Sequence, residues 1–313
     1  MADGYLLILL GAVMLSAMAA VRKEYQRRAG ATLVSTLFFM CVSSLFITLI
    51  GTVYALVTDL ALIGNADGLV LGLAAIFAVV LTVNTCLCIF GAKYGSLAVL
   101  MTFATLGTLV ISSIYGFIFA PEENALTVYR VAGMLLSAVI IALGFVGDRE
   151  AKGAERKRVS TQRIFILICI CVFIFNGSAL SIYSTFTEHR AEYGGFNFIF
   201  LYSFFCVALC LVGLAAIRLF GGRRAFSGEQ HTDKLRPAPV ICAVGYGMIF
   251  TVSEFCSLTT TSILPIVIQA PLSFAVNLVV VAVADYLIYR QRLTKMQIIQ
   301  VTLAILSGVC FAL

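Results

Sequence analysis

The chain alternates between long apolar segments and short polar gaps. Each apolar segment has 17 to 26 residues, and a helix of about 20 residues crosses the roughly 30 Å hydrocarbon core of a bilayer. Because nearly all charges lie in the gaps, we predict an all-α membrane protein with ten transmembrane helices. The predicted helices are Tyr5–Val21, Thr32–Val57, Leu69–Phe90, Ser96–Ala120, Leu126–Val146, Ile164–Phe186, Phe196–Ile217, Pro239–Cys256, Ile263–Ile288 and Met296–Leu313.

The composition agrees with this prediction. Hydrophobic residues make up 61% of the chain and charged residues 12%, which is more apolar surface than one soluble core of this length could bury. Transmembrane β-strands would alternate apolar and polar residues, whereas these segments are continuously apolar. The composition therefore favours membrane-spanning helices with lipid as their surroundings.

Basic residues are concentrated in every second gap. The gaps after the first, third, fifth, seventh and ninth segments hold 19 of the 21 lysines and arginines, and Arg130 and Arg190 are the exceptions. Because positive residues remain cytoplasmic, we expect both chain termini to face outward, in a bacterial cell membrane. Five short loops form no single basic face, so we expect anionic lipid headgroups and no nucleic acid as their partner.

Two segments near the ends of the two halves resemble each other. Residues 134–143 and 304–313 share five identical positions. The offset between them corresponds to five apolar segments plus the central gap. A repeat with an odd number of helices enters the membrane from the opposite side, which is typical of inverted-topology transporters. We therefore predict a first five-helix repeat over 1–147, a cytoplasmic basic linker over 148–163 and a second repeat over 164–313.

Residue types needed for catalysis or metal binding are sparse. The two histidines, His189 and His231, lie in gaps on opposite predicted sides. No nucleophile–base set or phosphate-binding glycine loop accompanies them. The ten cysteines lie in or beside apolar segments, where cysteine packs as a small hydrophobic residue. We expect no enzyme activity, no cofactor and no metal.

Short motifs in both halves are similar to those of a known transporter family. Gly91–Ser96 resembles a tight turn after the third helix, and Leu258–Ser262 resembles its counterpart in the second half. Pro271 resembles a helix-interrupting proline, and Glu123–Thr127 and Gln291–Thr294 resemble the polar turns before the fifth and tenth helices. In these features the chain resembles the EamA-like branch of the drug/metabolite transporter superfamily.

The resemblance implies a particular arrangement of ten helices. Helices one to four and six to nine would surround a central substrate site, and helices five and ten would lie outside it. Small residues four apart in helices five and ten would allow close helix contact in lipid. This chain departs from the family in having no proline in its fourth helix and in its expected outward-facing termini.

Polar residues inside the predicted helices are the candidate substrate-binding residues. Glu254 ranks first because a carboxylate is costly in hydrocarbon and could exchange a proton for a cationic or polar substrate. A hydrated position at the outer membrane interface is the alternative for Glu254. Asn84 precedes Glu254 by the same offset that separates the two similar segments. Gln269 and Asn277 are further candidates, for which interhelical hydrogen bonding is the alternative role. The remaining candidates are Asn176, Tyr183 and Tyr246.

These features favour a secondary active transporter of a small polar organic metabolite, such as an amino acid or an amine. Such a protein would work by alternating access, with protons coupled through Glu254. A non-transporting membrane subunit or assembly partner is the alternative, and a homodimer is left open. A channel is disfavoured because no ring of charges or filter-like loop is present.

Overall fold

The computed structural model describes residues 2–30, 32–58, 66–91, 97–119, 127–151, 159–220, 237–289 and 295–312. Nearly all of them are helical, and none of these described residues forms a β-strand, which confirms the all-α prediction. The helices are α1 (Ala2–Ala29), α2 (Leu33–Thr58), α3 (Gly68–Gly91), α4 (Leu97–Phe119), α5 (Val128–Ala151), α6 (Val159–Arg190), the short 3-10 helix η2 (Ala191–Tyr193), α7 (Gly195–Phe220), α9 (Pro237–Ile263), α10 (Ile266–Tyr289) and α11 (Lys295–Ala312).

Six of the helices contain stretches long and apolar enough to cross a membrane. The stretches are Gly4–Ala29, Leu33–Tyr54, Gly68–Gly91, Ile164–Tyr193, Gly195–Leu219 and Pro237–Ile263. Large apolar side chains cover the outward surfaces of the bundle, as in Leu6, Val128 and Leu219, which are 68%, 84% and 77% exposed. Such extensive apolar exposure suits a lipid environment and not water. The chain is therefore a multi-pass integral membrane protein.

Each predicted segment overlaps a helix, but four helices, α1, α5, α6 and α9, run well beyond their predicted ends. Helix α1 continues from the predicted end at Val21 to Ala29, and α9 continues from Cys256 to Ile263. Helix α6 begins at Val159 and thereby includes the end of the predicted linker. Hydropathy marks where charges begin, whereas a helix ends only where its backbone hydrogen bonding ends. The extension of α1 includes Arg22, and the extension of α9 moves the end of that helix further from Glu254.

The predicted tight turn at Leu258–Ser262 is wrong. These residues are helical, and the hydroxyls of Thr259, Thr260 and Thr261 each donate to the carbonyl four residues back, at 2.7–2.8 Å. Threonine can therefore continue a helix by bonding to its own preceding turn. The chain turns instead at Leu264 and Pro265, where proline lacks the amide hydrogen that a helix interior requires.

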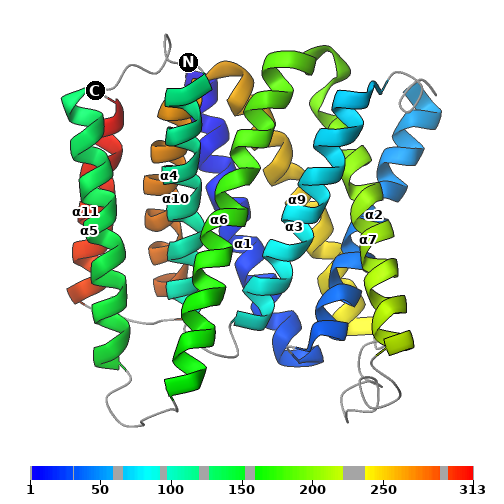
Figure 1. The fold of residues 1–313 in the computed structure, drawn as a ribbon, viewed down its shortest axis with the longest axis horizontal. Helices are drawn as coiled ribbons and strands as arrows, with labels where there is room; N and C mark the ends of the chain where they lie inside the picture. Colours follow the sequence, from blue (N-terminus) through cyan, green and yellow to red (C-terminus); the bar gives the residue numbers. More distant parts are fainter. Residues whose placement is uncertain are drawn as a thin grey trace.

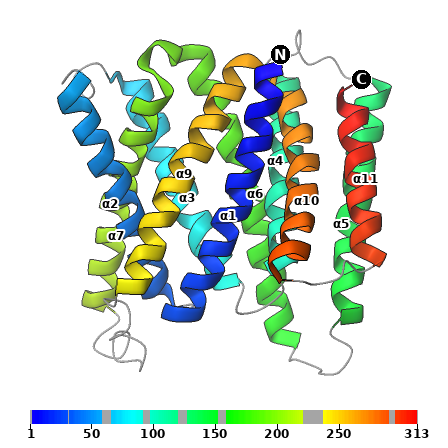
Figure 2. The same ribbon diagram turned by 180° about the vertical axis from the view of Figure 1, so that it is seen from behind.

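The helices form an elongated bundle with a recurring set of neighbours (Figure 1). Helix α1 packs against α9 and α10, and α6 packs against α3 and α4. Helix α2 pairs with α7 toward one end of the bundle, and α5 pairs with α11 at the opposite end. The reverse view shows both chain termini on the same side of the bundle (Figure 2). The pair α5–α11 is thus remote from the contact between α1 and α9.

Helix ends follow the local chemistry of their first and last residues. Gly30 adopts φ 74° directly after α1, and its amide donates to the Gln26 carbonyl at 2.9 Å. Glycine adopts this left-handed conformation without steric cost. Asp67 caps α3, because its Oδ1 accepts a hydrogen bond from the Val70 amide at 2.9 Å. These caps fix where the chain reverses at the two sides of the bundle.

Several predicted features lie outside the described residues. The turn predicted after the third helix falls there from residue 92 onward, and so do the polar turns at 123–126 and 291–294. Of the linker predicted over 148–163, residues 152–158 fall outside the described part, whereas 148–151 belong to α5 and 159–163 to α6. Pro271 lies inside α10, which continues through it.

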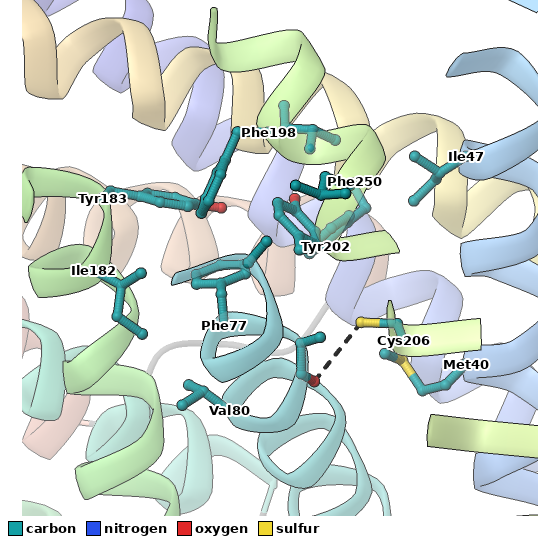
Figure 3. Close-up of a cluster of buried hydrophobic side chains, with 14 of the residues drawn as sticks. Met40, Ile47, Phe77, Val80, Ile182, Tyr183, Phe198, Tyr202, Cys206 and Phe250 are labelled. Carbon is teal, nitrogen blue, oxygen red and sulfur yellow. Dashed lines mark hydrogen bonds between the residues drawn. The ribbon is translucent and has the colours of Figure 1, made fainter. Parts of the chain in front are cut away.

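A cluster of aromatic rings joins α3, α6 and α7 (Figure 3). The Phe77 ring lies 4.7 Å from the Tyr183 ring and 4.6 Å from the Tyr202 ring, measured between centroids. Phe198 packs at the edge of both tyrosines. Ring pairs at such distances add about 0.5–1.5 kcal/mol beyond burial of their area. This cluster is a packing element of the core.

Helices α4 and α6 meet through backbone contact at two glycines. A Cβ atom on Gly107 would lie 2.0 Å from the Phe173 carbonyl oxygen, and one on Gly177 would lie 2.4 Å from the Gly107 carbonyl oxygen. Any side chain at these positions would clash with main-chain atoms. Close backbone approach through small residues is how helices pack tightly in lipid. The contact fixes how α6 presents its polar residues toward α4.

Candidate functional site: an arginine and a glutamate inside the bundle

Arg22 lies on the packed face of α1, although hydropathy places it in a polar gap. Its neighbours along the same helical stripe, Met18, Tyr25 and Ala29, are 3%, 0% and 0% exposed. Their spacing of three to four residues repeats once per helical turn. Arg22 itself is partly buried. The guanidinium therefore points among neighbouring helices.

Tyr246 of α9 holds the Arg22 guanidinium in two ways. Arg22 Nη2 donates a hydrogen bond to the Tyr246 hydroxyl, and the Arg22 guanidinium carbon lies 5.0 Å from the centroid of the Tyr246 ring. An arginine over an aromatic face is attracted by the ring quadrupole, more strongly where water is scarce. Tyr246 is 2% exposed. It is thus a buried platform that orients a cation.

Glu254 lies on the same helix as Tyr246, deep within α9. It is partly buried, and Ile263, the last residue of α9, is nine residues further on. At 1.5 Å per residue this places Glu254 about 14 Å inside the end of the helix. Sequence hydropathy suggested a position near the end of its segment. The continued helix instead brings Glu254 toward the middle of the bundle.

Arg22 and Glu254 interact electrostatically but form no ion pair at contact distance. Arg22 Nε is buried and has no hydrogen-bond partner among the described residues. A charged group inside a membrane is normally paired, because an unpaired charge is costly there. We refer to Arg22, Tyr246 and Glu254 as the charged cluster. Within this cluster, the Arg22 Nε hydrogen has no described acceptor.

A neutral cluster joins α3, α6 and α4. The Cys88 Sγ donates to Asn84 Oδ1 at 3.9 Å. Asn84 Nδ2 donates to Asn176 Oδ1 at 3.0 Å. Asn176 Nδ2 in turn donates to the Ala104 carbonyl and to Thr108 Oγ1, each at 2.8 Å. We refer to Asn84, Asn176 and Thr108 as the amide cluster.

The structure thus places four of the seven sequence-predicted site residues in two clusters. Glu254 and Tyr246 belong to the charged cluster, and Asn84 and Asn176 belong to the amide cluster. Sequence reasoning missed Arg22, which contacts Tyr246 in the charged cluster. The signal that could have revealed it was the stripe of Met18, Tyr25 and Ala29, which continues the apolar face of α1 past the charged residues.

No hydrogen bond described above includes the remaining three predicted residues. Gln269 is 3% exposed and donates from Nε2 to the Ser257 carbonyl at 3.2 Å, at the turn between α9 and α10. Tyr183 stacks on Phe77 in the aromatic cluster (Figure 3). Among the described residues, Gln269 Oε1, Asn277 Oδ1 and the Tyr183 hydroxyl have no hydrogen-bond partner. They remain candidates with open bonding capacity.

The described residues contain no group of three or more His, Cys, Asp or Glu side chains placed to hold a metal ion. The described cysteines are free thiols, spread over several helices. The charged cluster therefore offers a guanidinium, a carboxyl group and a phenol hydroxyl. Such groups bind and orient a polar molecule through charge-assisted hydrogen bonds.

Comparisons with known proteins bear on the fold. A solved structure described only as "Crystal structure of protein" matches with a TM-score of 0.63 and 14% sequence identity, over 99% of this chain and 96% of that chain. It is one of 27 solved chains that match. No protein-family model matches the chain, and no curated protein does. At so low an identity, the likeness concerns the arrangement of helices from end to end.

Proposed function

We propose that this protein is a secondary active transporter that moves a small polar organic metabolite by alternating access. The observation that carries the proposal is the charged cluster, in which Arg22 and Glu254 lie well inside the bundle without forming an ion pair. Polar and ionisable residues at membrane depth are expensive and are typical of substrate and ion pathways. A purely structural subunit has no need of them.

The helix boundaries support two repeats. The offset that carries residue 134 to residue 304 also carries α4 (97–119) to 267–289, and α10 is Ile266–Tyr289. The same offset takes α3 (68–91) to 238–261, and α9 is Pro237–Ile263. A slightly smaller offset takes α2 (33–58) to 195–220, the bounds of α7. The offset changes where the segment between α7 and α9 is longer than that between α2 and α3.

The packing of the helices supports the same arrangement. If α1, α2, α3, α4 and α5 are exchanged with α6, α7, α9, α10 and α11, the contact α1–α9 becomes α6–α3 and α1–α10 becomes α6–α4. The pairs α2–α7, α4–α10 and α5–α11 are exchanged with themselves. Five helices per unit would give the two units opposite orientations in the membrane. This is the architecture of transporters whose site lies between inverted repeats.

The proposed mechanism follows from this arrangement. The two repeats, each of five helices, rock against each other and expose the charged cluster alternately to the two sides of the membrane. Glu254 couples the movement to protons by releasing a proton as substrate binds. The fold and the motifs noted above are consistent with an EamA-like member of the drug/metabolite transporter superfamily in a bacterial cell membrane.

Transport can be tested with purified protein in liposomes. We expect uptake of at least one labelled solute from a panel of amino acids, amines and polyols, and we expect a proton gradient to change its rate. Glu254→Gln should abolish the response to the gradient. Glu192→Gln is the matched control, because Glu192 is exposed in η2 and lies outside both clusters. Its flux should equal that of the wild type.

The alternative function gives a different result. A non-transporting subunit would be well folded in detergent, would show no flux for any solute in the panel, and would co-purify with a partner from its native membrane. Flux that occurs equally in wild type and Glu254→Gln would keep the transporter and remove Glu254 from proton coupling.

A further inference from the structure

We propose that the substrate is a zwitterion whose carboxylate binds Arg22 and whose protonated amine binds Glu254. The inference rests on the proposed transport function and deepens it, because it assigns a substrate class and a role to an arginine that sequence reasoning had placed in a loop. It is carried by the open bonding positions of Arg22, by the platform beneath its guanidinium and by the charge balance of the cluster.

Arg22 is arranged to accept a carboxylate. Its Nη2 carries two hydrogens, and Tyr246 accepts one of them. The buried, unpartnered Nε hydrogen and one Nη2 hydrogen lie along one edge of the planar guanidinium, and this edge is open to a carboxylate when Tyr246 accepts the second Nη2 hydrogen. Two parallel donors of this kind match the two oxygens of a carboxylate. An incoming carboxylate would thus satisfy a donor that has no described partner.

Tyr246 fixes the orientation of that fork. The ring lies 5.0 Å from the guanidinium carbon and its hydroxyl accepts from Nη2. The ring is itself held by Phe39 and Phe250, with centroids at 4.9 and 5.8 Å. A guanidinium held on both its face and one donor loses little further freedom when a ligand binds, which favours affinity.

Glu254 supplies the matching site for a cation. Its carboxylate is close enough to Arg22 to interact electrostatically, yet it makes no contact ion pair and accepts no hydrogen bond from a described residue. Both residues project from helices that pack directly against each other, α1 and α9. A small molecule that carries both a positive and a negative charge would bridge the two groups.

Charge balance distinguishes a zwitterion from other small solutes. The cluster contains one positive and one negative side chain, so a bound zwitterion pairs all four charges. An anion would pair with Arg22 and leave Glu254 unpaired, and a cation would do the reverse. Leaving one charge unpaired away from water is the costly case. Among small ionic solutes, a zwitterion is therefore the one that the cluster fits best.

The test measures thermal stabilisation of purified protein by matched sets of probes. Each set consists of a free amino acid, its amide, which is only cationic, and its N-acetyl derivative, which is only anionic. A ligand that binds the folded state raises the melting temperature in a saturable way. In wild type we expect at least one free amino acid to bind tenfold or more tightly than both of its derivatives.

Two substitutions should reverse this preference in opposite directions. Arg22→Gln leaves the negative charge of Glu254, so the amide should now bind at least as tightly as the free amino acid. Glu254→Gln leaves the positive charge of Arg22, so the N-acetyl derivative should do so instead. Arg27→Gln is the control for Arg22→Gln, because Arg27 lies on the same helix, is exposed and pairs with Glu24 at 2.9 Å. It should keep the wild-type preference.

Other outcomes would overturn the inference. It is wrong if no free amino acid stabilises wild type, if a derivative binds wild type as tightly as its parent, or if both substitutions leave the preference unchanged. Arg22→Lys guards against misfolding of Arg22→Gln, since it keeps the charge and loses the fork, and it should weaken carboxylate binding about tenfold. Liposome flux of an amine, a monoanion or a neutral solute would reject the zwitterion and retain the transporter, whereas flux of no solute would reject the transporter.

Discussion

The charged cluster and the amide cluster lie at two different helix contacts of the bundle and use their polar groups in opposite ways. At the α1–α9 contact, Arg22 and Glu254 are ionisable side chains without a contact ion pair, and Arg22 Nε has no described hydrogen-bond partner. At the α3–α6 contact, Asn84 and Asn176 are neutral, and Asn176 bonds through both its oxygen and its nitrogen. The first contact keeps a donor without a described partner, whereas the amides of the second are hydrogen-bonded within the protein.

The difference bears on how polar residues in membrane helices should be interpreted. A buried polar group whose hydrogen bonds are satisfied within the protein stabilises and positions helices. A group with open donors and an uncompensated charge costs stability, and function is the usual reason that it persists. Asn84 and Asn176 were predicted from sequence as substrate-binding residues alongside Glu254. Their bonding instead favours the role of holding α3, α6 and α4 together.

The largest effect is expected from breaking the backbone contact that supports the amide cluster. Gly107→Ala would place a Cβ atom 2.0 Å from the Phe173 carbonyl oxygen, so α4 and α6 must separate and Asn176 must lose its acceptors on α4. Overpacking of this kind costs about 3 kcal/mol or more when main-chain atoms have to move. We expect a large fall in the free energy of unfolding measured in mixed micelles.

Gly72→Ala is the matched control for that substitution. Gly72 lies within α3, and a Cβ atom there would meet nothing within 4 Å. Alanine favours helix over glycine by about 1 kcal/mol, so this variant should be as stable as wild type or more so. Equal losses at Gly107 and Gly72 would contradict the close contact between α4 and α6.

A smaller loss is expected from removing the central amide itself. Asn176→Leu keeps a similar volume but leaves Asn84 Nδ2 without its partner, while the Thr108 hydroxyl still donates to the Ala104 carbonyl at 3.3 Å. Each unsatisfied buried group costs about 1–3 kcal/mol, although interhelical hydrogen bonds measured in membranes average nearer 0.6. We expect a loss of about 2 kcal/mol in the free energy of unfolding with unchanged ligand preference. A changed preference would return Asn176 to the substrate site.

Sequence patterns could predict which segments are helical but not all of their ends. Long apolar runs must be helices in lipid because every backbone group needs an internal partner. The ends depend on finer bonding. Thr259, Thr260 and Thr261 have the composition of a turn, yet their hydroxyls return to the preceding carbonyls and the helix continues to Ile263. That extension places Glu254 about 14 Å inside the helix end.

The candidate site was only partly predictable for the same reason. Glu254 could be found because an acid in an apolar run is conspicuous. Arg22 could not be found by charge, since Lys23 and Glu24 follow it and the three together resemble a loop. Only the packed stripe through Met18 and Tyr25 places Arg22 inside the bundle. The contact with Tyr246 joins residues 224 positions apart, which no local pattern specifies.

The two charges of the charged cluster should each cost less to remove than the amide. Arg22→Gln or Glu254→Gln leaves the other charge without compensation, and we expect each to lower the free energy of unfolding by about 1 kcal/mol. The expected loss in the free energy of unfolding lies between the losses measured for exposed ion pairs and for buried contact ion pairs. It is intermediate because Arg22 and Glu254 form no contact ion pair. The double substitution removes both charges and should be nearly as stable as wild type.

The double-mutant cycle therefore sharpens the comparison between the clusters. If the double variant is nearly as stable as wild type while each single variant is less stable, Arg22 and Glu254 stabilise each other. Additive losses would contradict any interaction between Arg22 and Glu254, and with it the shared binding of a zwitterion. The Arg27→Gln variant again provides the baseline, because its exposed pairing with Glu24 should contribute a few tenths of a kcal/mol at most.

The smallest effect concerns the exposed ion pair of Asp67 and Arg190, which is the solvated counterpart of the charged cluster. Arg190 Nε lies 2.5 Å from Asp67 Oδ2, and the two side chains are 36% and 40% exposed. The hydrogen bond from the Val70 amide lowers the pKa of Asp67, and Arg190 lowers it further. Unlike Glu254, this carboxylate has all its interactions in place at the N-terminus of α3.

The sign of the pH dependence follows from that lowered pKa. The unfolded chain takes up a proton near pH 3.9, whereas folded Asp67 stays ionised to lower pH, so the stability it contributes is present above pH 4 and is lost as pH falls through its folded pKa. Asp67→Asn should remove this acid sensitivity from melting curves recorded between pH 6 and pH 3. Because the backbone hydrogen bond is the larger cause, Arg190→Gln should keep most of it. Full loss in Arg190→Gln would instead show that the ion pair with Arg190 is the larger cause of the lowered pKa of Asp67.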